Sequence, residues 1–287
     1  MIDKYYNGVI EQFVSGIANV EHNSILVRYS NDFSIWDLES VNHYKDQSDI
    51  FFTCHEFSYN KIAEAYEPYL GLIRQMFHRY CSGTLEEFME ECDVYKLQRP
   101  VFESYFENGF CERTEQILID EVEYEQERMR NSIVTMLQKL SEIRPVVIVL
   151  NRFQLASKST MQLTNRLLQT KNKNIGIVLG VNDVQSIPEF AHEEWDAICE
   201  SMDDRNMVYH IGNAGRNMEP DVMDYYSDYE SDDGYRKLNN LVYFLDFDQA
   251  DHHLSKIERR IKFDNFTISE KKHYQLLLLQ IMVSVLQ

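Results

Sequence analysis

Residues 145 to 183 read PVVIVLNRFQLASKSTMQLTNRLLQTKNKNIGIVLGVND, and this stretch decides the fold. Its unbroken β-branched run at 146–150 predicts a strand that is buried on both faces, as in a parallel sheet. A second run of this kind follows at 175–179. Between the two, Ser157 or Ser159 can cap a helix whose apolar residues recur at helical spacing. Strand, helix and strand in this order predict one right-handed parallel crossover.

Apolar runs typical of strands and helical spacing of apolar residues also occur before and after residues 145–183. Residues 94–110 predict irregular structure with short helices. Taken together, the elements predict an α/β fold, with an open, mostly parallel five-stranded sheet in an αβα layer over residues 1–212. The three further strands are predicted at 24–29, 49–54 and 207–211, and the further helices at 5–18, 70–80, 85–92, 114–143 and 187–202.

The character of the chain changes after residue 212. Residues 213–237 are turn-rich and then strongly acidic, which is typical of a solvated linker or insertion. Residues 238–287 predict a helical hairpin, whose first helix runs to Ile261 and whose second helix, at 270–286, is apolar on nearly all sides. A helix this apolar needs a neighbour on its far side. We therefore expect either further helical repeats or a homo-oligomer that pairs through this helix.

Composition limits the classes of function. With 44% hydrophobic residues, the 287-residue chain can bury a full core. The formal net charge of −19 argues against an electrostatically driven nucleic-acid or anionic-membrane surface. Five cysteines at wide spacing form no CxxC pair, so neither a zinc site nor a disulfide framework is expected. The N-terminus has no apolar signal region, and we expect a cytoplasmic protein.

The segment from Val146 to Asp183 resembles the Walker B to sensor 1 segment of STAND and AAA+ ATPases, which include the large LuxR-type transcriptional regulators, and a looser resemblance extends from Gly8 to Ile211. The resemblance implies a P-loop NTPase-like sheet with its strands in the order 2-3-1-4. It places the family's acidic residues at Asn151, Arg152 and Ser157, and a sensor residue at Asn182. Because an arginine cannot act as the base, the implied site is catalytically degenerate.

The loop at residues 30–39 takes the place of the family's phosphate-binding loop. It contains no glycine and no lysine, whereas a phosphate cradle needs close backbone N–H groups and a cation. We therefore assign Ser34, Trp36 and Asp37 to the degenerate nucleotide site and expect no cofactor there.

Arg152 leaves two alternatives open. Its guanidinium can neutralise Asp32 or Asp37 and close the former nucleotide edge, or it can be a solvent-exposed side chain without a role.

The leading hypothesis is a catalytically degenerate STAND/AAA+-like domain, more a scaffold than an enzyme. It would contact a protein partner or its own downstream domains in a signalling or transcription-regulator protein. Residues around Ala250 and Leu254 resemble a TPR-type helical hairpin, which fits that setting. The alternative is an unconventional NTPase switch that binds ATP and Mg²⁺ through Asn151, Asp183 or Asp32.

A third hypothesis is a protein-binding module that acts through the acidic segment at 219–233. Its aromatic and acidic side chains would dock on a basic partner. The candidate contact residues are Tyr225, Tyr226, Tyr229, Glu230 and Asp232.

Overall fold

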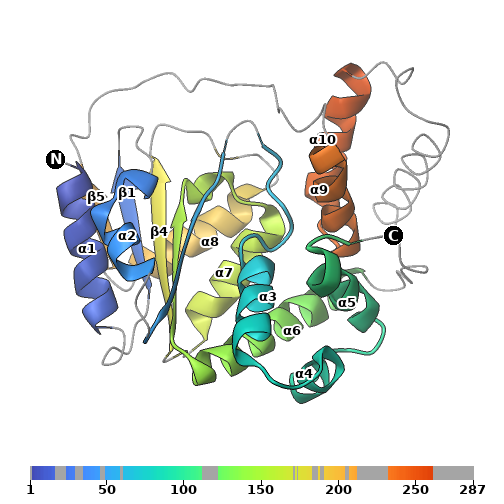
Figure 1. Cartoon of the computed structure of the whole chain (residues 1–287). Helices are drawn as coiled ribbons and strands as arrows, with labels where there is room; N and C mark the ends of the chain where they lie inside the picture. Colours follow the sequence, from blue (N-terminus) through green and yellow to red (C-terminus); the bar gives the residue numbers. More distant parts are fainter. Residues whose placement is uncertain are drawn as a thin grey trace.

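The structure of the protein is a computed structural model, shown in Figure 1. It describes residues 2–16, 24–29, 35–45, 49–58, 61–111, 122–170, 172, 174–182, 187, 191–203, 207–211 and 232–260. Within these residues, no helix is both long and apolar enough to cross a membrane.

Five parallel strands form one open sheet, which confirms the predicted α/β class. They are β1 (Ser24–Tyr29), β2 (Phe51–Glu56), β3 (Val146–Asn151), β4 (Ile175–Asn182) and β5 (Val208–Ile211). Their order is β2-β3-β4-β1-β5, so the implied order 2-3-1-4 is wrong: β4 lies between β3 and β1. The pairing of β4 with both strands agrees with its burial, because all eight of its residues are buried.

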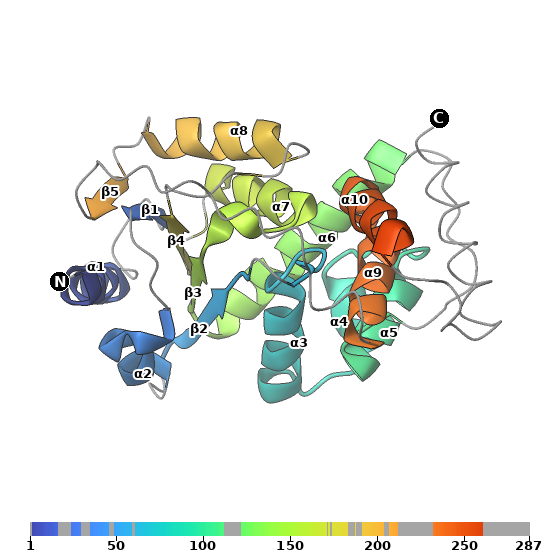
Figure 2. The ribbon, with the colours of Figure 1, turned by 90° about the horizontal axis from the view of Figure 1, so that it is seen from above.

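Helices cover both faces of the sheet (Figure 2). One face packs against α1 (Ile2–Gly16), the short 3-10 helix η1 (Ile35–Asp37) and α2 (Glu39–Lys45). The other packs against α3 (Tyr69–Tyr80), α6 (Val122–Ile143), α7 (Lys158–Gln169) and α8 (His192–Asp203). Side chains of β3 alternate between the two: Val147 and Val149 face α1, whereas Ile148 and Leu150 face the larger core. This is the predicted αβα layer.

Two short helices follow α3. The sequence Thr84-Leu85-Glu86-Glu87 has the pattern of a capping box, and at the start of α4 (Leu85–Glu91) Thr84 and Glu87 bond each other's backbone N–H groups. Where irregular structure with short helices is predicted at 94–110, residues 94–98 are irregular and α5 (Arg99–Asn108) is a single ten-residue helix. A proline in its first turn and Gly109 at its C-cap, with φ of 79°, delimit it.

The C-terminal helices are α9 (Asp232–Tyr243) and α10 (Phe247–Arg260). The prediction of one continuous helix from 238 to 261 is wrong, because Leu245 adopts a left-handed conformation (φ 64°) and ends the α-helical path. Helix α9 begins within the range assigned to the linker. Residues 261–287, which include the second predicted helix, lie outside the described part of the chain, and the domain boundaries stay a prediction.

Helix α9 packs into the same apolar core as the sheet. Leu238, Leu241 and Phe244 are fully buried within it. The ring of Phe244 meets three other rings nearly edge-on, with centroids 5.6 to 6.1 Å apart; these belong to Tyr66, Phe102 and Tyr105. Figure 1 shows α9 beside α5 at the end of the molecule away from β5.

We predict that Phe244→Ala lowers the free energy of unfolding by about 3–5 kcal/mol, because it leaves a cavity among these rings. Denaturant unfolding of the full chain measures this. Asp251→Ala on the exposed side of α10 serves as the control and should change stability by less than about 0.5 kcal/mol. Equal effects of the two substitutions would contradict the packing described for α9.

Candidate functional site

Four of the five strands end in a polar side chain at the carboxyl edge of the sheet. These residues are Tyr29 on β1, Glu56 on β2, Asn151 on β3 and Asn182 on β4. Ligands of open α/β sheets bind outside this edge. The structure therefore brings the predicted positions Asn151, Arg152 and Asn182 together at the place where a ligand site is expected.

The amide of Asn151 on β3 is bound from β1, across the intervening strand β4. The Tyr29 hydroxyl donates to Asn151 Oδ1 at 2.7 Å, and both residues are fully buried. Gly180 on β4 lies against this pair. A Cβ atom there would stand 2.7 Å from Asn151 Oδ1 and 2.6 Å from the Tyr6 hydroxyl of α1. The amide oxygen that would ligate Mg²⁺ in the implied site is thus enclosed by two phenols and a glycine.

Arg152 pairs with an acid that the sequence reasoning did not consider. Its Nη1 lies 3.1 Å from Glu56 Oε1, and the other carboxylate oxygen of Glu56 accepts from the backbone N–H of Ile35 at 3.1 Å. The Arg152 side chain is 16% exposed, so the solvent-exposed alternative is wrong. Of the acids that were considered, Asp32 lies outside the described residues, and the side chain of Asp37 is not described.

Asn182 is held through its backbone. Gln154, in the 3-10 turn η2 (Phe153–Leu155) after β3, accepts from the Asn182 N–H and donates to the Asn182 carbonyl. Both residues are buried. The turn that follows β3 is therefore fixed to the end of β4.

Of the remaining predicted positions, the structure describes the side chains of Ser157 and Trp36. Ser157 is the N-cap of α7 and accepts from the Thr160 N–H, so its role here is structural. Trp36 in η1 is 49% exposed at the end of β1. Ser34, Tyr225, Tyr226, Tyr229 and Glu230 lie outside the described residues, and of Asp232 only its place at the start of α9 is described.

Sequence reasoning missed Tyr29, Glu56, Gln154, Tyr6 and Gly180. A signal existed for one of them, because Tyr29 is the last residue of the strand predicted at 24–29. Applying the carboxyl-edge rule there would have selected it, whereas the strand predicted at 49–54 ends two residues before Glu56.

Tyr6, whose hydroxyl lies against Gly180, is poorly suited to acid–base chemistry. Burial, with smaller contributions from Tyr29, Cys54 and Glu56, raises the pKa of Tyr6 well above its ordinary value. The phenol therefore stays protonated at neutral pH. Within the part of the chain that the structure describes, no cluster of three or more His, Cys, Asp or Glu side chains could hold a metal ion.

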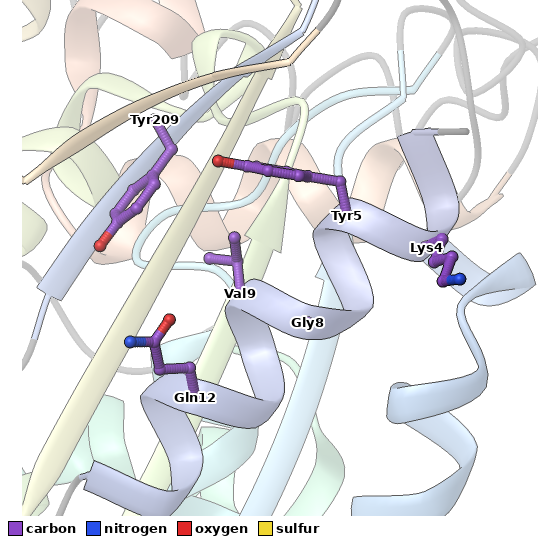
Figure 3. Close-up of a pocket in the computed structure, with 6 residues that line it drawn as sticks. All are labelled: Lys4, Tyr5, Gly8, Val9, Gln12 and Tyr209. Atoms are coloured by element: carbon purple, nitrogen blue, oxygen red, sulfur yellow. The ribbon is translucent and has the colours of Figure 1, made fainter.

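A separate surface pocket of about 550 Å³ lies between α1 and the edge strand β5. Figure 3 shows the rings of Tyr5 and Tyr209 on two sides of it, with Val9 and Gln12 from α1 between them. Lys4 and Gly8 complete the lining. None of these six residues is acidic, so the pocket offers no carboxylate for catalysis or for metal binding.

Comparison with protein-family models and with curated proteins finds no match for this chain. The case for a function therefore rests on the geometry of the carboxyl edge.

We predict that Gly180→Ala lowers the free energy of unfolding by about 1–3 kcal/mol, because two buried polar groups must move to admit the methyl group. Gly8→Ala is the matched control. No atom lies within 4 Å of the added carbon there, and replacing a mid-helix glycine stabilises by roughly 0.5–1 kcal/mol. Thermal unfolding should therefore shift in opposite directions for the two variants, and a shift in the same direction would contradict the enclosure of Asn151.

Proposed function

We propose that this chain is a catalytically degenerate STAND/AAA+-like domain that acts as a regulatory or scaffolding element. The observation that carries the proposal is the occupation of the carboxyl edge by the protein's own side chains. Tyr29 binds Asn151, and Glu56 joins Arg152 to η1. Among the described residues, those at the positions of the family's acids, Asn151, Arg152 and Ser157, are each engaged in a structural contact. Asp32 and Asp183 lie outside the described residues.

The parallel sheet supports the proposal at the level of fold. Its topology places the ends of β1 and β3 on either side of β4, where the loops after both strands reach the same edge. In a working site of the resembled type, these loops would supply the phosphate cradle and the metal-binding acid. Here β1 is followed by Trp36 and β3 by Arg152.

The partners we propose are proteins. A net charge of −19 disfavours binding to nucleic acid. In the scaffolding role that we propose, this chain contacts another protein or its own downstream domains.

We predict that calorimetric titration of ATP or ADP with Mg²⁺ into the full chain gives no binding heat at millimolar nucleotide. The unfolding temperature should also be unchanged by nucleotide under the same conditions. A nucleotide that bound the folded state would raise this temperature. Stoichiometric binding would sink the scaffold proposal and favour the NTPase switch.

The role of Arg152 gives a second test. If the edge is structural, Arg152→Ala should lower stability by about 3–5 kcal/mol, because it leaves the nearly buried Glu56 carboxylate without this cation. Arg166→Ala is the control, since Arg166 is half exposed and its contact with Glu127 should contribute no more than about 1 kcal/mol. Functional sites are commonly strained, so a gain in stability on Arg152→Ala would instead indicate a ligand site.

A further inference from the structure

The turn between α9 and α10 places one buried carboxylate at the start of two helices. Asp246 directly precedes α10, and its backbone carbonyl accepts the N–H of Ala250 in the first turn of that helix at 3.1 Å. Asp246 Oδ2 accepts from the Ser159 N–H in the first turn of α7, at 2.9 Å. Asp246 is only 4% exposed. The residue that begins α10 therefore also binds the first turn of α7 through its side chain.

A second side chain of the same turn completes this contact. Gln249 Oε1 accepts from the Lys158 N–H at 3.2 Å, and Gln249 Nε2 donates to the Ala63 carbonyl at 3.1 Å. The first two N–H groups of α7 are thus satisfied by the α9–α10 turn. Only the third is satisfied locally, by Ser157. Separation of the turn from α7 would leave the first two N–H groups without these partners.

Helix α9 is tied to the body at another point by two amides. Asn240 Oδ1 accepts from the Cys111 N–H at 2.7 Å, and Asn239 Nδ2 donates to the Cys111 carbonyl at 3.2 Å. The Cys111 side chain is fully buried. Between the two polar junctions, Phe244 covers the aromatic rings of Tyr66 and Phe102.

We propose that α9 and α10 form a strap that opens from the α/β body as one unit, with Asp246 as its latch. The coupling follows from the place of Asp246 and Gln249 where α9 meets α10, because both side chains bind the first turn of α7 and loss of these contacts releases both helices. Side-chain amides and carboxylates regain hydrogen bonds to water on opening, so the polar junctions resist separation less than an equal apolar area. Opening uncovers Cys111 and the aromatic surface beneath Phe244. The proposal stands whether or not nucleotide binds at the carboxyl edge.

The test compares Asp246→Ala with Asp246→Asn in the full chain. Burial raises the pKa of Asp246, so its negative charge is unfavourable in this position, and asparagine keeps an oxygen acceptor without that charge. Alanine removes the acceptor altogether. The readout is the rate at which a small thiol reagent modifies Cys111, resolved by peptide mass spectrometry. Cys92, a buried thiol that follows α4, reports on unfolding of the body.

We expect Asp246→Ala to raise the rate at Cys111 by about tenfold or more, as loss of a helix cap implies, with no change at Cys92. The Cys111 modification rate in Asp246→Asn should stay close to that of the protein without a substitution. An unchanged Cys111 rate in Asp246→Ala would overturn the proposal, and so would equal acceleration at Cys111 and Cys92. If Asp246→Ala fails to fold, Gln249→Ala decides: a selective rise at Cys111 supports the strap, and no rise overturns it.

Discussion

The parallel pairing of β3 with β4 is the constraint on which the rest of the structure depends. Every residue of both strands is buried, so both faces and both outer edges of the pair must be covered by other elements. Helices α1 and α2 cover one face, and α6, α7 and α8 cover the other. Strands β2 and β1 complete the edges. Pairing of the two strands alone then brings together the residues near their carboxyl ends. This is why Asn151 of β3 lies against Gly180 of β4.

The sequence could predict what depends on neighbouring residues. Apolar runs located all five strands, and the capping box located α4. Two of the helix boundaries it missed are governed by backbone geometry at single residues. Helix α5 is bounded by a proline and Gly109, and the break between α9 and α10 occurs at Leu245, a residue that ordinarily favours a helix. Strand order was also wrong, because pairing between distant strands is decided by the packing of the whole sheet.

The candidate site was predictable in position but not in its contacts. Asn151, Arg152 and Asn182 follow or end apolar runs, so their place at the carboxyl edge could be expected. Their partners come from other elements: Tyr29 from β1, Glu56 from β2 and Gln154 from the turn after β3. Proximity of this kind is set by strand register and cannot be obtained from spacing along the chain.

The place of β1 in the sheet has a consequence for biosynthesis. Both of its partners, β4 and β5, belong to the second half of the chain, so a ribosome releases β1 long before either is made. Until then, an apolar strand carries two open hydrogen-bonding edges, which is the state most prone to pair with the wrong chain. We therefore expect nascent β1 to depend on chaperones that bind extended apolar segments, and native β1 to form only after β4 and β5 have been synthesised.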